Sequence, residues 1–339
     1  MLAAAFAAAV AFATVAVTPR LRDSTTYLPP RLTDSAFWQL IDELSEPGGT
    51  FLSSNYVSNE RDYQRVIPEL EKHKKPGGVY IGVGPDQNFT YISALQPAIA
   101  FIVDIRRENM LLHLMHKALL ELSPDRAVFL SRLFSRPPAD VERASPGRTL
   151  LDAYADAVPD ETRLEQNVRA VADCLVRRHG FALTPGDLGT IARAQRAFFD
   201  AGPELRYAYP HRVYPTYAEL MVETDNRGEP RSYLSSEEAF LEVKRLEEKN
   251  LIVPVVGDFA GGKALRAVGA YLRRRRATVN VFYTSNVEFY LRETGGLPRF
   301  FDNVAALPVD RDSVFIRASF TGEPAMRVDA IGEPRTLDR

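Results

Sequence analysis

The sequence has very few residues that could form cross-links or bind metals. It contains a single cysteine, Cys174, in 339 residues. One cysteine cannot form an intramolecular disulfide, and it excludes a zinc cluster built from several thiolates. Because Cys174 lies in an amphipathic helical pattern, we expect it to pack in the interior. His113 and His116 have no nearby acid or third histidine to complete a ligand set, so we expect surface histidines and no metal site.

The sequence also lacks an excess of charge of either sign. Lysine and arginine total 42 against 44 acids, while 25% of the residues are charged and 45% are hydrophobic. The charge balance gives no electrostatic reason to expect nucleic-acid binding, and the composition is that of a folded protein. We therefore expect a small-molecule ligand or a protein partner. The sequence does not indicate an oligomeric state.

No apolar run is long enough to predict a transmembrane helix. Leu2–Val17 is apolar apart from Thr14, but its sixteen residues fall short of the roughly 20 that span a bilayer. The small residues of Ala11–Ala13 fit a signal-peptide cleavage pattern, although no lysine or arginine precedes the run. We expect residues 1–30 to be an export signal or a membrane anchor with a tether. A cytoplasmic chain with a mispredicted start is the alternative.

Short apolar runs that end at turn or polar residues predict the strands of a sheet. They are Val79–Val83, Ala100–Ile105, Leu251–Val256, Thr278–Tyr283 and Ser313–Ala318, with a weaker one at Ala127–Leu130. An apolar stripe predicts a helix over Arg106–Leu122, and a capping-box pattern at Ser235–Glu238 predicts another. Strands that alternate with helices indicate an α/β, Rossmann-like fold with a mostly parallel, doubly wound sheet.

The alternation breaks between residues 135 and 233. Helical patterns there precede a stretch rich in tyrosine and proline, Tyr207–Tyr217. We interpret residues 135–233 as a helical insertion or cap. Residues 31–134 and 234–339 are then the two parts of the Rossmann-like domain.

The strongest local signal is Gly78–Phe89, a predicted buried strand that leads directly into a glycine turn. Gly82 and Gly84 have no Cβ, so a ligand can approach the backbone closely at the carboxyl end of the strand. The next strand ends near Asp104, 20 residues after Gly84, where a carboxylate can accept hydrogen bonds from ribose hydroxyls. A nucleoside-type ligand explains this pattern, and a tight turn followed by a helix-capping aspartate is the alternative.

The segment Gly257–Lys263 again joins a predicted strand to a helix through a glycine loop. Asp258 is either a site residue or a helix cap. The segment also matches the GxxxxGK pattern of phosphate-binding loops. However, Ala264 stands where such a loop needs Ser or Thr to bind magnesium, so we do not favour a phosphate site.

Further polar residues fall near the same predicted edge of the sheet. Tyr283 and Ser285 follow a strand and could face the cleft, whereas Asn286 is expected to cap a helix. A polar cluster ahead of the first strand could cover a ligand or serve as loop and cap residues; it comprises Asn55, Tyr56, Asn59 and Glu60.

Taken together, these segments resemble the S-adenosylmethionine-dependent methyltransferases over residues 77–109. In that superfamily the glycine-rich loop holds the methionine part of the cofactor, and an acid after the second strand holds the ribose. The resemblance implies S-adenosylmethionine as cofactor and Asp258 as the catalytic residue that orients the acceptor. The implied cofactor-binding residues are Gly82, Gly84, Pro85, Asp86, Asn88, Asp104 and Arg106.

This chain departs from the superfamily pattern at two positions. Tyr80 stands where an acid usually precedes the first glycine, and Asp86 stands at the third glycine position. Asp86 could replace the missing acid. We also predict that the first strand lies between the second strand and Leu251–Val256, which would bring Asp104 and Asp258 to its two sides.

The motifs GVGPDQNF, VDIRREN, VPVVGDFAG and SNVEFYL are also similar to an uncharacterised bacterial family with this core behind an exported N-terminus. That similarity implies a fold but no activity. Two functions therefore stay open. One is methyl transfer from S-adenosylmethionine to an unknown acceptor, and the other is an exported, non-enzymatic binding or structural protein on the same scaffold.

Overall fold

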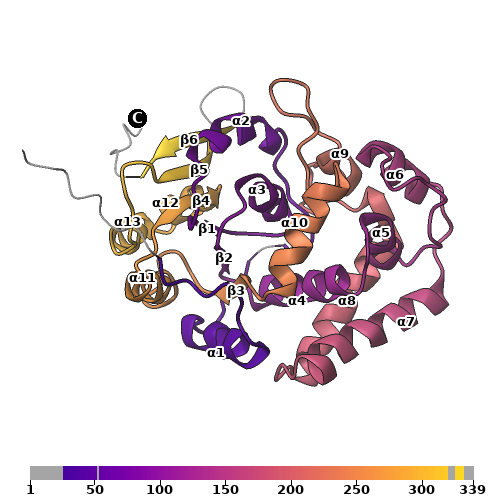
Figure 1. The fold of residues 1–339 in the computed structure, drawn as a ribbon, viewed down its shortest axis with the longest axis horizontal. Helices are drawn as coiled ribbons and strands as arrows, with labels where there is room; N and C mark the ends of the chain where they lie inside the picture. Colours follow the sequence, from indigo (N-terminus) through magenta and orange to yellow (C-terminus); the bar gives the residue numbers. More distant parts are fainter. Residues whose placement is uncertain (1–25, 52, 320–324, 332–339) are drawn as a thin grey trace, which may run out of the picture.

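The structure is a computed structural model that describes residues 26–51, 53–319 and 325–331 (Figure 1). The predicted export signal, Leu2–Val17, lies outside these residues. Among the residues described, none of the helices combines the length and the apolar character that a membrane crossing requires.

A six-stranded sheet in the order β3-β2-β1-β4-β5-β6 forms the centre of the molecule. Neighbouring strands from β3 to β5 pair in parallel, and β6 pairs antiparallel to β5. The strands are β1 (Val79–Gly82), β2 (Ile99–Asp104), β3 (Ile252–Val256), β4 (Val279–Ser285), β5 (Val314–Ser319) and β6 (Ala325–Ala330). The predicted α/β class and mostly parallel sheet are confirmed. The edge strand β6 was not predicted.

The position of β3 differs from the prediction. β1 lies between β2 and β4, whereas β3 pairs with β2 at the edge of the sheet. The predicted contact between the first strand and Leu251–Val256 is therefore wrong. The chain continues outward from β2 to β3, and its direction across the sheet reverses only when it returns to place β4 beside β1. The reversal puts the ligand crevice typical of such sheets at β1 and β4.

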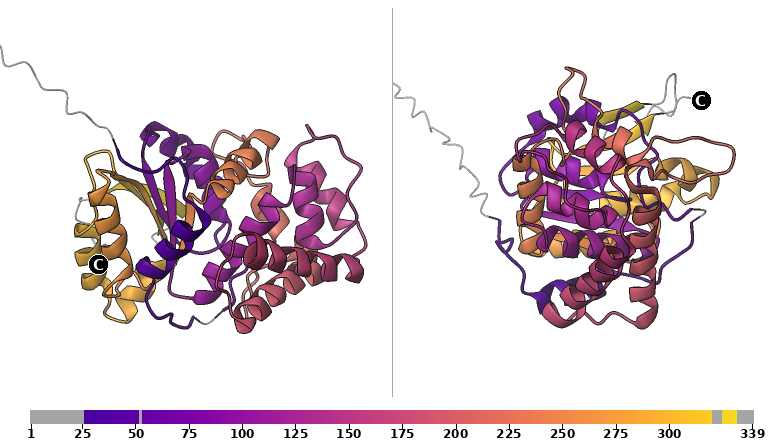
Figure 2. Two further views of the ribbon diagram at one scale, coloured as in Figure 1. Left: turned by 60° about the horizontal axis from the view of Figure 1, so that its bottom comes forward. Right: turned by 90° about the vertical axis from the view of Figure 1, so that its right-hand side faces the viewer.

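Helices cover both faces of the sheet, as Figures 1 and 2 show. One face carries α3 (Gln87–Leu95), α4 (Arg107–Glu121) and α10 (Glu237–Glu248). The other carries α1 (Asp34–Leu44), α11 (Ala264–Arg274) and α13 (Leu297–Ala305), and α12 (Val287–Glu293) follows β4. The short turns η1 (Tyr63–Val66), α2 (Ile67–Leu70) and η2 (Glu71–His73) precede β1.

A group of helices lies to one side of the sheet, beyond α4 and α10 (Figures 1 and 2). It consists of α5 (Arg126–Phe134), α6 (Gly147–Ala155), α7 (Glu161–Ala172), the π-helical turn η3 (Asp173–Arg178), α8 (Pro185–Ala201), η4 (Gly202–Glu204) and α9 (Tyr217–Met221). Residues 135–233, all of which are described, contribute no strand to the sheet and form only isolated bridges such as Arg206 with Thr216.

The weak strand predicted at Ala127–Leu130 is part of helix α5. Asp125 begins this helix, since its side chain accepts a hydrogen bond from the Val128 amide at 2.8 Å. A four-residue apolar run fits either a strand or one face of a helix. The capping aspartate decides for the helix here, because it satisfies an amide that has no partner within the helix.

Helix α4 is buried on nearly all sides. Leu111, Leu114 and Ala118 are buried as predicted, and Leu122 just beyond the helix is partly buried. His113 and His116 are also buried, so the prediction of surface histidines is wrong. The reason is that α4 contacts β2 and β3 on one side and α8 and α10 on others, which leaves it no solvent-facing stripe.

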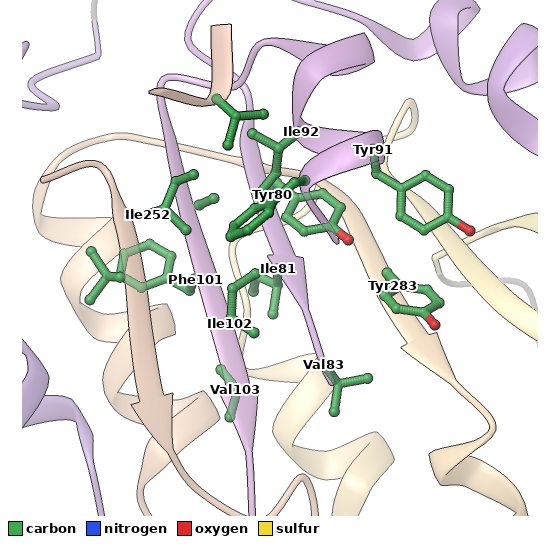
Figure 3. Packing of buried hydrophobic residues seen from close by; sticks show 14 of the residues in the cluster. Tyr80, Ile81, Val83, Tyr91, Ile92, Phe101, Ile102, Val103, Ile252 and Tyr283 are labelled. Atoms are coloured by element: carbon green, nitrogen blue, oxygen red, sulfur yellow. The ribbon is translucent and has the colours of Figure 1, made fainter. Parts of the chain in front are cut away.

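Tyrosines supply much of the core beside β1 and β4. Tyr80, Tyr91 and Tyr283 are fully buried, and Figure 3 shows their rings close together next to these strands. Each hydroxyl makes a hydrogen bond. Tyr80 donates to Asn88 Oδ1 at 2.8 Å, and Tyr91 donates to the carbonyl of Tyr63 at 2.9 Å. Because buried hydroxyls need partners, this layer fixes the side chains around the carboxyl edge of the sheet.

Replacing Leu114 with alanine tests the burial of α4. Leu114 is 0% exposed, so Leu114→Ala should lower the free energy of unfolding by about 2–5 kcal/mol. The matched control is Leu241→Ala on α10, where the leucine is 37% exposed and the loss should stay below about 1 kcal/mol. Urea denaturation measures both. Equal losses would contradict the packing described.

Candidate functional site

The residues that follow α1 run across the carboxyl edge of the sheet. We call residues 45–51 and 53–60 the covering segment. The Glu46 amide donates to the carbonyl of Val256, the last residue of β3, at 3.0 Å. The Gly49 amide donates to the carbonyl of Ile105, just beyond β2, at 2.8 Å. Its far end places Glu60 beside β4, where Tyr283 donates to the Glu60 carboxylate. The segment therefore runs over the loops in which ligands of α/β proteins bind.

The glycine turn after β1 is held by side chains of this chain. Asn88 Nδ2 donates to the carbonyls of Val83, Gly84 and Pro85 at 2.9, 3.2 and 2.7 Å. A Cβ on Gly82 would lie 2.0 Å from Asn88 Oδ1, so this glycine is required for the asparagine to pack. Gly84 has a φ of +80°, a conformation that favours glycine. Internal packing alone accounts for both glycines.

The Asp86 side chain is hydrogen-bonded to a tyrosine outside the glycine turn. Its carboxylate is 1% exposed and accepts a hydrogen bond from the Tyr233 hydroxyl at 2.9 Å, and Tyr233 in turn pairs with the Tyr217 hydroxyl. Burial raises the pKa of Asp86 to about 6. The aspartate thus joins α3 to the region before α10, and it does not take the place of the acid that Tyr80 replaces.

Asp104 forms a closed pair with Arg106. Both side chains are buried, and the guanidinium donates to both carboxylate oxygens at 3.1 Å. The Arg106 amide also donates to Asp104 Oδ1 at 2.9 Å, while Arg106 Nη1 donates to the carbonyl of Ser54 at 2.6 Å. The pair ties the covering segment to the end of β2. A ribose could reach Asp104 only by displacing these hydrogen bonds.

The loop after β3 surrounds a carboxylate of the covering segment. The amides of Asp258 and Lys263 donate to the two oxygens of Glu46 at 2.9 and 3.1 Å. A Cβ on Gly261 would lie 2.2 Å from Glu46 Oε1. Glu46 therefore occupies the position in which a GxxxxGK loop would hold a phosphate.

Asp258 itself closes a turn in this loop. Its Oδ1 accepts a hydrogen bond from the Ala260 amide at 2.8 Å. Because β2 lies between β3 and β1, Asp258 is separated from the glycine turn by two strand spacings, or about 10 Å. Asp258 is therefore not a helix cap, since Lys263 stands at the N-cap of α11. The structure also does not bring Asp258 beside Gly84.

A polar cluster lies where the winding reverses, between β1 and β4. Tyr283 and Ser285 both donate to the carboxylate of Glu60, and Gln87 Nε2 donates to the Tyr283 hydroxyl at 3.1 Å. Burial raises the pKa of Glu60. Ser285 ends β4 with a φ of 53°, a strained conformation for a residue other than glycine. Asn286 stands at the N-cap of α12, but its side chain makes no capping hydrogen bond.

Three buried acceptor atoms around Gly84 have no donor among the described residues: Gln87 Oε1, Asn109 Oδ1 and His113 Nδ1. Asn109 Nδ2 and His113 Nε2 both contact the carbonyl of Gly84, at 3.1 and 2.8 Å. Burial lowers the pKa of His113 to about 4, so its ring is neutral at pH 7. Nε2 then carries the proton that faces the carbonyl, and Nδ1 is left as a bare acceptor.

The sequence identified part of this site. The predicted residues Gly82, Gly84, Pro85 and Asn88 lie together where β1 passes through the glycine turn into α3. Asp104 ends β2, and Arg106 follows it. Glu46 and Gln87 were missed. Gln87 stands inside the GVGPDQNF motif, whereas no local pattern marks Glu46, whose partners lie more than 200 residues away.

Replacing Asp86 with asparagine tests its burial. The folded-state pKa of about 6 exceeds the value of about 4 in an unfolded chain, so the folded state binds this proton more tightly. The free energy of unfolding should therefore fall as the pH rises from about 4 to 6, and Asp86→Asn should remove that loss.

Relative to the unmutated protein, Asp86→Asn should gain about 2–3 kcal/mol between pH 4 and pH 7. Urea unfolding at both pH values measures the difference. Asp42→Asn, at an exposed aspartate of α1, is the matched control. A difference between Asp86→Asn and the unmutated chain that does not change with pH would contradict the assignment.

One comparison with known proteins identifies a family for this chain. No curated protein matches the sequence of this chain. One family model matches residues 55–330, which include every strand of the sheet, and its description is a domain of unknown function, DUF7790. Since the match extends over most of the sequence, this chain belongs to the DUF7790 family.

Proposed function

We propose that this chain binds a small molecule rich in hydrogen-bond donors at the carboxyl edge of its sheet, between β1 and β4. The observation that carries the proposal is the group of three buried acceptors around Gly84 that have no donor within the described residues. A buried acceptor without a donor costs about 1–3 kcal/mol, so a ligand that supplies donors recovers that free energy. The reversal of winding at β1 and β4 supports the same location.

A nucleoside-type ligand suits these acceptors. Ribose hydroxyls and amino groups donate hydrogen bonds. The Gln87 side chain lies by Gly84, and its amide donates to Tyr283, which in turn donates to the Glu60 carboxylate at the end of β4. S-adenosylmethionine carries ribose hydroxyls, an adenine amino group and an α-amino group. It is the first ligand to test, and the resemblance of residues 77–109 to the methyltransferases favours it independently.

Several residues that this resemblance assigns to the cofactor do not fit it in the conformation described. The Asp104 carboxylate is saturated by Arg106, and Asp86 is buried against Tyr233. The space beside Gly82 is filled by Asn88. S-adenosylmethionine would have to displace Arg106 before its ribose could bind Asp104. We therefore derive no methyl-transfer step from this geometry, and ligand binding is the function we propose.

The second candidate is a binding or structural protein without enzymatic activity. The covering segment favours it, because the segment satisfies groups that a cofactor would otherwise use. Glu46 accepts the amides of the loop after β3, and the carbonyl of Ser54 accepts from Arg106. An edge whose polar groups are largely paired within the chain needs no cofactor to be stable.

Titration calorimetry of the full chain against S-adenosylmethionine tests the proposal. We expect binding by the unmutated protein and at least about a tenfold loss of affinity for Gln87→Leu, which removes one acceptor from the site. Gln39→Leu, on the exposed side of α1, is the matched control and should bind as the unmutated chain does. Circular dichroism confirms that each variant is folded.

Asp104→Ala tests whether the ribose of the ligand contacts Asp104, as it would in the arrangement that the methyltransferase resemblance implies. If a ribose reaches Asp104, this variant loses charge-assisted hydrogen bonds of about 1.5–3 kcal/mol each, and affinity falls at least tenfold. Unchanged affinity in the folded variant would place the ligand away from Asp104. Failure of the folded, unmutated chain to bind either S-adenosylmethionine or adenosine would contradict the nucleoside proposal and favour the non-enzymatic scaffold.

A further inference from the structure

A second group of ionisable side chains is buried near the opposite end of α4. Glu121 ends this helix, about 20 Å from its first residue, Arg107, at the carboxyl edge of the sheet. Cys174 and His179, from the turn η3 and the residue after it, approach Glu121, and the potential ligand atoms of all three lie within 4.8 Å of one another. No local pattern in the sequence connects these three residues.

The imidazole of His179 is held in a defined orientation. Its Nδ1 lies 2.9 Å from Asp34 Oδ1, and its Nε2 lies 2.8 Å from Glu121 Oε2. Asn250 donates to the same Asp34 oxygen at 2.9 Å. A histidine that binds a metal through one ring nitrogen usually donates a hydrogen bond from the other nitrogen to a carboxylate, which fixes the orientation of the ring. Asp34 is placed to accept such a hydrogen bond from His179.

The π-helical turn explains why Cys174 and His179 face the same point. The His179 amide donates to the carbonyl of Cys174, five residues earlier, at 3.1 Å. In a regular α-helix the residues that face each other are three or four apart, so a pair five apart would diverge. The wider π turn aligns them, and such turns are frequent at functional sites.

We propose that Glu121, Cys174 and His179 bind one divalent metal ion of the zinc type. A thiolate, an imidazole and a carboxylate form a donor set that zinc accepts. Tetrahedral zinc would separate these donors by about 3.4–3.6 Å. The Cys174 Sγ lies 4.0 Å and the His179 Nε2 lies 2.8 Å from Glu121 Oε2, so the atoms need to move by about 1 Å or less.

A metal ion would bind the cysteine and the histidine in their deprotonated forms. The thiolate of Cys174 and the neutral imidazole of His179 are the forms that donate electron pairs to a metal. Metal ions therefore compete with protons for these two side chains, and affinity should rise with pH.

The other charged groups around the cluster compensate the charge of Glu121 but leave one of its oxygens accessible to a metal ion. Lys117 Nζ pairs with Glu121 Oε1 at 2.7 Å and lies 4.0 Å from Glu247, which leaves Glu121 Oε2 for the metal. The guanidinium of Arg178 lies 3.8 Å from that second oxygen, but it is largely exposed and free to withdraw.

The cluster can be reached from solvent on two sides. A surface hollow of about 460 Å³ is lined by residues that include Leu122, Cys174 and Arg178. Another hollow, of about 430 Å³, is lined by residues that include Asp34, Trp38 and His179. An entry path is one requirement of a metal site, and here it leads to two of the three ligands.

Cobalt substitution tests the proposal. The full chain is stripped with a chelator, dialysed and titrated with Co²⁺, which takes zinc positions. We expect one ion bound per chain and a thiolate-to-cobalt charge-transfer band in the near ultraviolet. Cys174→Ser should abolish the band and weaken binding at least about tenfold, and His179→Gln should also weaken it at least tenfold.

His211→Gln is the matched control, since that histidine is exposed and far from the cluster in sequence. It should bind cobalt as the unmutated chain does. Absence of the band in the folded, unmutated chain would overturn the proposal and leave an ion-pair network only. Cobalt affinity unchanged by Cys174→Ser would overturn it as well. If His179→Gln does not fold, the result for Cys174→Ser alone tests the proposal, because serine replaces cysteine with little change in size.

Discussion

Two carboxylates hold the covering segment onto the carboxyl edge of the sheet, and the arrangement of that edge depends on them. Glu46 accepts amides of the loop after β3, and Glu60 accepts the hydroxyls of Tyr283 and Ser285 at the end of β4. Between them, Arg106 joins the carbonyl of Ser54 to Asp104. These contacts place a short stretch of chain across three strand ends, so any ligand there must bind beneath it or displace it.

The burial of α4 links the two polar regions of the molecule. At its first turns, Asn109 and His113 contact the carbonyl of Gly84, and at its end Glu121 meets His179. The helix is enclosed by the sheet on one side and by α8 and α10 on others, so the polar residues between Asn109 and Lys117 are buried. Burying them is costly unless each has a partner. That constraint explains why unpaired acceptors beside Gly84 point to a ligand.

Much of the sheet could be predicted from the sequence because β1, β2 and β3 are continuous apolar runs that end at glycine or aspartate. The place of β3 could not, since a long helical region separates it from β2 and local patterns do not set strand order. The glycine turn was predictable for the same local reason. The contact of Glu60 with Tyr283 joins residues 223 positions apart, and the pairing of Cys174 with His179 depends on a π turn that periodicity does not reveal.

We propose that the edge between β1 and β4 receives a small molecule under the covering segment. Hydrogen–deuterium exchange of the full chain, with and without saturating S-adenosylmethionine, tests it most directly. We expect slower exchange in peptides spanning residues 53–60, 82–89 and 104–113, and no change at residues 170–180 beside the proposed metal cluster. Unchanged exchange in all three peptides, or protection confined to other regions, would contradict it.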